Sequence, residues 1–544
     1  MPENKWLEFQ IFNFNIPVPY TIYDDFESLI VKINSCAPDP ARSYTVPIAD
    51  HIPCGYAYTV IGPDGNFKKP PVVYRGENTV DHFLENLIKE EEEILNILKN
   101  VKPMLFSDEN KLDFKNATIC HIYEKPLLGD RVRDHDHLTG TYRGAAHNIC
   151  NINYTLAKHI PVMIHNLRGY DSHLIMQSVG KIKNKNLTCI PSNSKNFQKF
   201  RERHLPPKDT FFSSHINEPI NDDEYAHCIN VWETFNLKNL GEYHVLYVTS
   251  DVILLADVFQ NFRQLCLNFY KLDPCHCYTA PGLAWQACLY MSRVKLELLT
   301  DLDMHLFIER GIRGGISMIS HRFSSANNKY LESYDEVKPS KYILYLDANN
   351  LYGWAMSQFL PTHGFEWIKE PVNFMEISDE SDIGFILEVD LDIPENLHDL
   401  HNDYPLAPET LNVTNDMLSP YCKEIAEKYN LNINSCTKLV PNLMSKKRYI
   451  LHYRNLKQYV SLSLKVAKIH KILKFHQRPW LKKYIDFNTE KKEKAQSLFE
   501  KDLFKLLNNA VFGKTMENLR KRTVIDLVQD QIKAKKTCCF TGIS

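Results

Sequence analysis

The sequence lacks long hydrophobic runs: none approaches the roughly 18 apolar residues that a membrane-spanning helix requires. Its start, MPENKWLEFQ, has no apolar signal segment, and no internal repeat or low-complexity segment occurs. The 14 cysteines among 544 residues are too sparse and too irregularly spaced for a disulfide scaffold. We therefore expect an intracellular protein without membrane contact, with the nucleus as one open location, whose thiols are free or bind metal.

The chain also has little net charge, −2 from 64 basic and 66 acidic residues, but these charges are unevenly placed. Residues 441–544 hold 24 basic and 8 acidic side chains, a net charge of +16. The first 440 residues hold 40 basic and 58 acidic side chains, a net charge of −18. No acid occurs among residues 441–485, which carry 12 Lys or Arg. This stretch is too rich in Leu, Ile and Tyr for a disordered tail, so we interpret it as a folded basic face that meets phosphates.

Length and composition indicate a chain of several folded domains. At about 150 residues a domain, 544 residues make roughly three or four, and 44% hydrophobic content is enough for real cores. Hydrophobic periodicity predicts strands that alternate with helices, and hence mixed α/β domains. We expect helices at residues 81–100, 243–262 and 491–512, and strands at 162–164, 341–347 and 384–393. The acids at 90–93 are expected on the solvated face of the first helix.

Asp25 and Glu27 are the first acids whose spacing indicates chemistry. They lie two residues apart in a predicted strand, so both side chains leave the same face of the sheet, as a shared divalent metal requires. The spacing is a weak signal alone, because Asp222 and Glu224 repeat it in NDDEY, which reads as a polar loop.

Two further acids and a tyrosine strengthen this prediction. Asp171 ends the segment HNLRGYD after an apolar strand, and Asp251 follows Tyr247 by one helical turn in YVTSD. Four carboxylates with a phenol match two-metal phosphodiester hydrolysis, in which ions about 3.5–4 Å apart clamp the attacking and leaving oxygens. Each acid, taken separately, also fits an ordinary strand end or helix cap.

Five segments, in this order, resemble motifs of family B DNA polymerases. The three exonuclease motifs are resembled by YDDFES, HNLRGYD and YVTSD. The first polymerase motif is resembled by LDANNLYG at 346–353, and the second polymerase motif by KLLNNAVFG at 505–513. The sequences of these segments are most similar to those of the organellar and viral type B branch, as found in protein-primed viruses, linear plasmids and DNA transposons. The resemblance implies an α/β and α+β multidomain fold, with a ribonuclease-H-like exonuclease domain plus an incomplete polymerase palm and fingers.

The resemblance also implies a domain order and a function. Residues 1–270 would form the 3′-5′ exonuclease-like domain, interrupted by an insert at 105–155, and residues 271–345 would connect it to a partial palm and fingers at 346–544. The implied function is that of a DNA-directed DNA polymerase that replicates a mobile element or virus-like genome. The implied cofactor is Mg²⁺, and the implied partners are primer-template DNA, deoxynucleoside triphosphates and, as an open alternative, a terminal protein primer.

In the polymerase half, the resemblance implies a role for each motif residue. Asp347 would hold metal-bound triphosphate, and the tyrosine of NLYG would lie beneath the incoming sugar and reject ribonucleotides. Lys505 and Phe512 share one helix face, where they would meet the triphosphate and the new base pair. Core packing is the alternative for Phe512. The predicted nucleotide-binding residues are Tyr352, Lys505, Asn509, Phe512 and Gly513.

The basic face and a pair of glycines predict DNA contacts. Basic residues interleaved with Tyr449, Tyr453 and Tyr459 suit sequence-independent binding of phosphates with ring or sugar contact. The glycines of GIRGG permit close backbone approach to a strand, although the family commonly has a tyrosine where this chain has Ile312. The predicted DNA-binding residues are Arg313, Gly314, Gly315, Lys446, Lys447, Arg448 and Arg454.

A His/Cys cluster in the predicted insert resembles the zinc-dependent recombination endonuclease VII module. By that resemblance Cys120, His147 and Cys150 bind Zn²⁺, while a D-H-x-H run and a final Asn bind a catalytic metal. The family's first Cys pair is C-x-x-C, but here the second position is Tyr123, so either His121 substitutes or three ligands remain. The predicted catalytic residues of this module are Asp134, His135, His137 and Asn151.

Parts of the family pattern are missing. The last polymerase motif is an Asp-Thr-Asp pair, but the 31 residues after Gly513 contain only Asp526 and Asp530. Asp390 and Asp392 come too early in the order and read as outward acids of a strand. Only 79 residues separate the acids of the second and third exonuclease motifs. We therefore expect that this chain does not extend a primer. Two alternatives to a polymerase function stay open: a catalytically dead remnant that binds nucleic acid, and an endonuclease that acts through the His/Cys insert.

Overall fold

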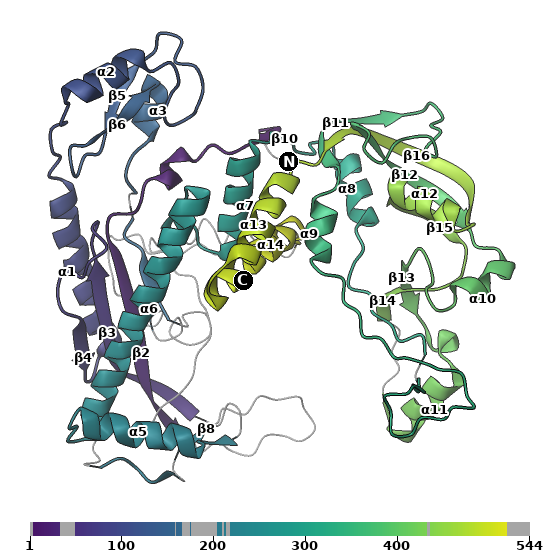
Figure 1. Ribbon diagram of the computed structural model, residues 1–544, viewed down its shortest axis with the longest axis horizontal. Helices are drawn as coiled ribbons and strands as arrows, with labels where there is room; N and C mark the ends of the chain where they lie inside the picture. The colour runs from purple at the N-terminus through teal and green to yellow at the C-terminus, as the bar shows by residue number, and fades with distance from the viewer. Residues whose placement is uncertain are drawn as a thin grey trace, which may run out of the picture. The chain divides into compact units, whose positions relative to one another are not determined.

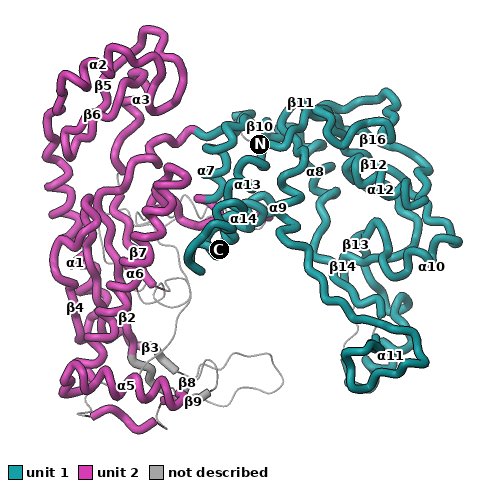
Figure 2. The backbone as a smooth tube through the Cα atoms, in the orientation of Figure 1, with its two compact units in different colours: residues 1–9, 284–516 teal, residues 10–283, 517–544 magenta. Residues whose placement is uncertain are grey.

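The computed structural model describes residues 4–32, 49–157, 159–165, 175, 204–208, 211–213, 218–321, 323–431, 436–518 and 520. The chain divides into two compact units (Figure 2). Unit 1 consists of Met1–Phe9 and Ala284–Met516, and unit 2 of Gln10–Leu283 and Glu517–Ser544. The mixed α/β character predicted from the sequence is confirmed in both units.

Unit 2 is built on a four-stranded sheet with a long helix on each face (Figure 1). Its elements are β2 (Thr21–Lys32), β3 (Ala49–Ile61), β4 (Val72–Arg75), α1 (Thr79–Leu98), β7 (Val162–Ile164) and α6 (Leu240–Tyr270). The strand order is β4-β3-β2-β7, and only β7 runs parallel to its neighbour. Alternation along β2 sends Ile22 and Phe26 into the core under α1, and Tyr23 into the core under α6.

Helix α6 is also long and apolar enough, by length and composition only, to cross a membrane. In unit 2 its Val248, Val252 and Ala256 are buried against Tyr23 and Ala57 of the sheet. One face of α6 therefore packs on the sheet, and 17% of its most apolar 18-residue window is buried.

In unit 2 the predicted polar loop at Asp222 and Glu224 is wrong, and the predicted solvated face of residues 90–93 holds for Glu92 and Glu93 but not for Glu90. Asp222 and Glu224 begin a helix, α5 (Asp222–Thr234), because Asn221 and Glu224 form a capping box that satisfies the first backbone N–H groups. Glu90 is 5% exposed and not solvated, since it accepts a hydrogen bond of 2.7 Å from the Tyr58 hydroxyl. The remaining short strands of unit 2 are β8 (Phe212–Ser213) and β9 (Glu218–Pro219).

The predicted insert has a small core of its own. Its elements are α2 (Asp108–Asn116), β5 (Val132–His135), β6 (Tyr142–Ala146) and α3 (Asn148–Asn153). Strands β5 and β6 form an antiparallel hairpin. Its buried residues are Cys120, Ile122, Leu127, Ala145 and Ala146.

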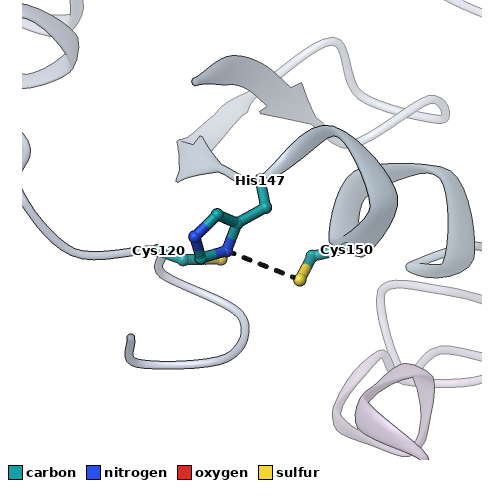
Figure 3. Close-up of side chains that lie close together, drawn as sticks. All are labelled: Cys120, His147 and Cys150. Atoms are coloured by element: carbon teal, nitrogen blue, oxygen red, sulfur yellow. Dashed lines mark hydrogen bonds between the residues drawn. The ribbon is translucent and has the colours of Figure 1, made fainter. Parts of the chain in front are cut away.

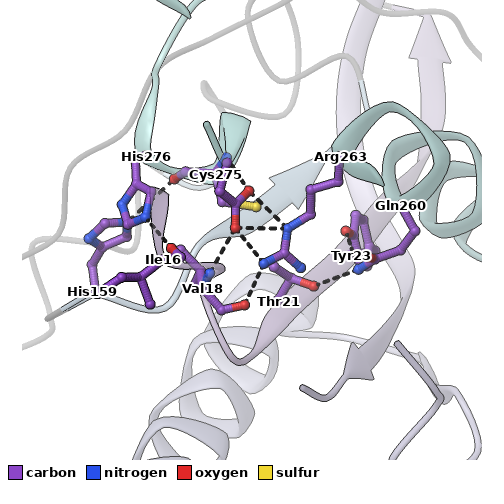
Figure 4. A network of polar contacts seen from close by, with 10 residues as sticks. Ile16, Val18, Thr21, Tyr23, His159, Gln260, Arg263, Cys275 and His276 are labelled. Atoms are coloured by element: carbon purple, nitrogen blue, oxygen red, sulfur yellow. Dashed lines mark hydrogen bonds and ion pairs between the residues drawn. The ribbon is translucent and has the colours of Figure 1, made fainter. Parts of the chain in front are cut away.

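A buried ion pair joins three separate segments of unit 2 (Figure 4). Asp273 is fully buried and accepts hydrogen bonds from the Arg263 Nη2 at 2.6 Å and from the backbone N–H of Val18 at 2.7 Å. Arg263 also donates to the Val18 carbonyl. The pair therefore fixes the end of α6 against the chain that leads into β2 and against the segment around Cys275.

Unit 1 contains a second four-stranded sheet, in the order β11-β16-β12-β15 and antiparallel throughout. Its elements are α8 (Leu302–Gly311), β11 (Leu360–Ile368), β12 (Ile383–Asp392), β15 (Lys446–His452), α12 (Tyr453–Ser461) and β16 (Lys465–Arg478). Alternation along β12 buries Leu387, Val389 and Leu391 completely, and Asp390 and Asp392 lie on the opposite face as predicted.

The other elements of unit 1 include the helix that carries the second polymerase motif. The predicted helix at 491–512 is two helices, because Ser497 caps the second one by accepting from the Glu500 N–H. The elements are β1 (Trp6–Leu7), β10 (Leu296–Glu297), α9 (Leu351–Met356), α10 (His398–His401), β13 (Glu409–Val413), α11 (Pro420–Lys428), β14 (Cys436–Val440), α13 (Lys482–Lys494) and α14 (Leu498–Thr515), while α7 (Ala280–Ser292) begins at the end of unit 2.

The strand predicted at 341–347 is absent. Apart from one bridge between Lys341 and Asn327, these residues pair with no described strand, and Tyr345 is 97% exposed. Apolar and β-branched residues form a strand only where a neighbour satisfies their backbone groups, and no described segment does so here.

Candidate active site and metal-binding groups

Three of the predicted acids meet on one face of the unit 2 sheet. Asp25 and Glu27 project from β2 towards α6, because residues two apart in a strand share a face. Asp251 projects from α6, and the carboxylate oxygens of the three residues lie within 4.8 Å of one another. The two β2 acids are buried, at 6% and 7% exposed.

The electrostatics of this cluster favour a bound cation. Burial raises the pKa of Asp25, and the neighbouring His165 only partly offsets it. Burial and the charge of Asp25 both raise the pKa of Asp251. Three carboxylates converge here, and carboxylate oxygens are the ligands that Mg²⁺ prefers, so the residues fit a Mg²⁺ site.

Tyr247 lies one helical turn before Asp251 and hydrogen-bonds to it. Burial, followed by the charges of Asp251, Glu27 and Asp25, raises the pKa of its phenol. The hydroxyl is therefore protonated at neutral pH and donates, with 38% of the side chain still exposed. Asp171, the fourth predicted acid, lies outside the described residues, so its place is not part of this geometry.

His165 belongs to this site and was not predicted from the sequence. Its Nδ1 lies 3.8 Å from the Asp25 Oδ1, because it directly follows β7, which pairs in parallel with β2 up to Asp24 and Ile164. The only sequence signal would be its position immediately after an apolar strand. That signal identifies no partner without the strand pairing.

Cys120, His147 and Cys150 also come together, within 4.8 Å (Figure 3). His147 lies at the N-cap position of α3 and Cys150 in its first turn, with 3.7 Å between the His147 Nδ1 and the Cys150 Sγ. Burial and the adjacent Cys120 raise the pKa of the Cys150 thiol to about 11. A bound cation would stabilise the thiolate forms of these two cysteines, and the donor set suits zinc.

The structure resolves the two alternatives for a fourth ligand. The His121 Nε2 lies 3.0 Å from the Asp134 Oδ2, so His121 does not substitute for the missing cysteine. Tyr123 donates its backbone N–H to the Cys120 sulfur, while its hydroxyl accepts from Lys125. Among the described residues the group therefore supplies three ligands.

The predicted catalytic residues of the insert are only partly assembled. Asp134 was expected to bind a catalytic metal, but it is 2% exposed and both of its oxygens accept from Arg143, at 2.7 and 2.8 Å. That prediction is wrong, because the carboxylate is already satisfied by Arg143 and His121. The rings of His135 and His137 lie 4.8 Å apart, and Asn151 lies in α3.

The polymerase motif residues in unit 1 are mostly exposed. Tyr352 of α9 stacks on Phe512 of α14 at 4.1 Å between ring centroids, with 20° between the planes. Lys505 and Asn509 lie on the exposed face of α14, as does Gly513. Asp347 is exposed in the unpaired segment before α9, and it joins no metal-binding group among the described residues.

The basic residues predicted to bind DNA differ in their access to solvent. Lys446 is completely buried and pairs with Glu409 at 2.8 Å, so the predicted DNA contact is wrong for this residue. Contacts of DNA with the rings of Tyr449 and Tyr453 are also excluded by burial, at 6% and 0% exposed. Both belong to the core of the sheet.

The other predicted DNA-binding residues are accessible but have protein partners. Lys447 lies 3.7 Å from Asp390, and Arg448 lies 3.5 Å from Glu388. Arg454 donates to the side chain of Gln358, and Arg313 to backbone carbonyls. A Cβ added at Gly314 or Gly315 would meet no atom within 4 Å, so this backbone is open to a ligand.

The acidic cluster with its phenol belongs to unit 2, and the helix face with Lys505 and Asn509, whose Phe512 stacks on Tyr352, belongs to unit 1. Residues 206–539, more than half of the chain, match the family model described as DNA polymerase type B, organellar and viral, and the chain belongs to that family. The resemblance predicted from the motifs is confirmed, and the function of the family is that of a DNA-directed DNA polymerase.

Solved structures of phi29 DNA polymerase also match the chain. The orthorhombic crystal form is 12% identical with a TM-score of 0.38. The ternary complex with primer-template DNA and incoming nucleotide is 14% identical with a TM-score of 0.40, and the complex with single-stranded DNA is 13% identical with a TM-score of 0.37. Each match covers 92% of this chain and 68% of that chain. No curated protein matches the chain.

Proposed function

We propose that this chain binds DNA and, with Mg²⁺, removes nucleotides from 3′ ends at the cluster of Asp25, Glu27 and Asp251. The observation that supports this is the convergence of three acidic side chains from a strand and a helix, with a phenol hydrogen-bonded to one of them. In this proposal residues 1–270 are the ribonuclease-H-like exonuclease domain, and residues 346–544 contribute palm and fingers.

The residues of the cluster divide the work of phosphodiester hydrolysis. When bound, Mg²⁺ would supply Lewis-acid activation of water and neutralisation of negative charge. Asp25, Glu27 and Asp251 would hold these ions through carboxylate oxygens, together with Asp171 by resemblance. Tyr247, whose raised pKa keeps it protonated, would orient the water oxygen towards the phosphorus. The water oxygen forms the new P–O bond, and the bond to the 3′ oxygen of the preceding nucleotide breaks.

The polymerase half of the proposal assigns binding roles. Lys505 and Asn509 would contact deoxynucleoside triphosphate from the exposed face of α14, with Tyr352 and Phe512 beside the sugar and base. Asp347 has no carboxylate partner among the described residues, and two ions need more than one acid. We therefore propose that this chain does not extend a primer. Priming by a terminal protein and descent from a transposable element are also part of the proposal.

A nuclease assay tests this function. The chain with Mg²⁺ is expected to shorten 5′-labelled single-stranded DNA from its 3′ end, and EDTA is expected to stop the reaction. In the same assay, primer-template DNA with all four deoxynucleoside triphosphates is expected to show no extension. A 3′ end that stays intact in Mg²⁺ would contradict the nuclease proposal. Primer extension that is abolished by Asp347→Ala would contradict the proposal that this chain does not extend a primer.

The His/Cys insert supports a second candidate function, zinc binding. Cys120, His147 and Cys150 would hold Zn²⁺ through two sulfurs and a nitrogen, and zinc would supply a rigid link between α3 and the segment before β5. Endonuclease action through His135 and His137 is the weaker proposal, because Asp134 is occupied by Arg143.

Removal of one sulfur tests the zinc proposal. The purified chain is expected to contain about one equivalent of zinc, and Cys150→Ser is expected to lose most of it, because two protein ligands bind zinc weakly. Elemental analysis measures both. Cys422→Ser, at an exposed cysteine in α11, is the matched control and is expected to keep its zinc. Equal zinc content in the two variants would contradict the assignment.

A further inference from the structure

Residues 341–347 of unit 1, KYILYLD, expose a continuous apolar stretch. The five side chains between the two terminal charges are 57–97% exposed: Tyr342, Ile343, Leu344, Tyr345 and Leu346. The backbone groups of residues 342–347 make no hydrogen bond with any part of the chain that the structure describes. The stretch has no proline and no internal charge, which are the features that protect open strand edges. It therefore favours pairing with another strand.

The first residue of this stretch shows which of its two edges is open. The backbone N–H of Lys341 donates to the Asn327 carbonyl at 2.7 Å, and the Lys341 carbonyl accepts from the Asn327 N–H at 2.9 Å. Successive residues of an extended strand direct their backbone groups to opposite edges. The edge of Lys341 is therefore the one already used, and the open edge is that of Tyr342, Leu344 and Leu346.

The sequence of the stretch is complementary to itself when two copies run antiparallel. If Leu344 of one copy lies opposite Leu344 of the other, Lys341 lies opposite Asp347 at both ends of the pair. Both charged side chains are exposed, and neither forms an ion pair with a described residue. Opposite charges that face one another stabilise antiparallel strands. A parallel pair in register would instead place like charges side by side, so the charges favour the antiparallel arrangement.

The same register also fits the open edge and the apolar side chains. In a pair centred on Leu344, the residues that exchange both backbone hydrogen bonds are Leu344 with its own copy and Tyr342 with Leu346. These are the residues of the open edge, so the bonds of Lys341 to Asn327 can remain. On the other face Ile343 lies opposite Tyr345, an aromatic and a β-branched side chain that pair well across strands.

We propose that residues 341–347 form a two-stranded antiparallel sheet with the same residues of a second copy of this chain. The two copies would be related by a two-fold axis through Leu344. The bonds to Asn327 hold one end of the stretch and α9 follows its other end, which lowers the ordering cost of pairing. One short strand pair buries less than the about 1,200 Å² of a stable interface, so we expect a reversible dimer with Kd on the order of 10 µM. The proposal does not rest on the proposed nuclease function, since the acidic cluster lies in unit 2.

Charge reversal at the two ends tests this proposal. Sedimentation equilibrium of the full chain, from about 1 to about 100 µM, measures the dimer Kd. Lys341→Asp places acids opposite acids at both ends of the pair, and Asp347→Lys places bases opposite bases, so each is expected to raise Kd about tenfold or more. Lys338→Asp is the matched control, because Lys338 pairs with Asp335 of its own chain at 2.9 Å, and it is expected to change Kd less than twofold.

Two combinations of these variants identify the antiparallel register. The double change Lys341→Asp with Asp347→Lys restores opposite charges at both ends and is expected to return Kd to within about twofold of the parent value. An equimolar mixture of the two single variants is expected to form a heterodimer about as stable as the parent dimer, since acids of one chain then face bases of the other. Leu344→Pro removes the central N–H and is expected to abolish the dimer, with the thermal unfolding midpoint of the monomer unchanged.

Two results would overturn the proposal. A parent chain that stays monomeric up to about 100 µM would mean that no second copy pairs with residues 341–347. A dimer whose Kd stays the same in Lys341→Asp, Asp347→Lys and Leu344→Pro would mean that the copies meet through another surface. Removal of 3′ nucleotides is measured on the same preparations, and its presence or absence bears only on the proposed function.

Discussion

Asp251→Asn is expected to slow removal of 3′ nucleotides by about a thousandfold or more. The change removes one of three carboxylates that converge within 4.8 Å, and the amide that replaces it carries no charge to hold a divalent ion. Loss of about 4 kcal/mol of transition-state stabilisation corresponds to this factor. Single-turnover degradation of 5′-labelled single-stranded DNA in Mg²⁺ measures the rate. Asp25→Asn is expected to have an effect of the same order.

The matched control is Asp257→Asn. It makes the same chemical change in the same helix, but Asp257 is exposed and is not part of the acidic cluster, so the rate is expected to stay within twofold. Tyr247→Phe removes only the hydroxyl and is expected to slow the reaction by about a hundredfold. If Asp251→Asn and Asp257→Asn cut equally fast, the cluster is not the catalytic site.

The raised pKa values of Asp25 and Asp251 predict the pH dependence of this activity. A carboxylate with a raised pKa is protonated at a higher pH than an ordinary aspartate, and a protonated acid binds metal poorly. Activity at limiting Mg²⁺ is therefore expected to rise with pH, and added Mg²⁺ is expected to shift the rise to lower pH.

Asp273→Asn is expected to lower the free energy of unfolding of the chain by about 3–5 kcal/mol, because it leaves the Arg263 charge buried without its partner. Burial raises the pKa of Asp273, but the Arg263 guanidinium and two backbone N–H groups outweigh it and lower the pKa below 3.8. The stability that the pair contributes is thus present above that value and is lost as the pH falls through the lower pKa of the folded state. Urea denaturation at pH 7 measures the change.

Two controls separate the buried charge from the loss of an ion pair as such. Asp486→Asn breaks an exposed pair with Lys482 and is expected to leave the unfolding midpoint unchanged. The double change Arg263→Met with Asp273→Leu removes both charges and is expected to cost less stability than Asp273→Asn alone. A double variant that is less stable than the single one would show that the hydrogen bonds to Val18 and Cys275, and not the charge, stabilise this junction.

Much of the acidic cluster was predictable from residue spacing. Asp25 and Glu27 share a face because side chains alternate along a strand, and Tyr247 lies beside Asp251 because four residues make about one helical turn. Both relations are local properties of the backbone and need no knowledge of neighbouring elements. The family was predictable for a related reason, since each motif is a short local segment whose order along the chain is visible.

Contacts between elements could not be predicted in this way. The spacing of Lys446 and Arg448 along β15 says nothing about Glu409, which comes from another hairpin and buries Lys446, or about Glu388, which lies on a neighbouring strand. His121 was an alternative zinc ligand until the hairpin placed Asp134 against it. Residues 341–347 have the pattern of a strand, yet a strand requires a neighbour, and the pattern does not provide one.

The chain sequence therefore predicted many of the elements, the faces of their side chains and the family, because these follow from local periodicity and motif order. Tertiary structure decided which charges are free. It buried Lys446, occupied Asp134 and left Arg313 without an acidic partner among the described residues. The physical reason is that the desolvation and pairing of a charge depend on groups that are distant in sequence.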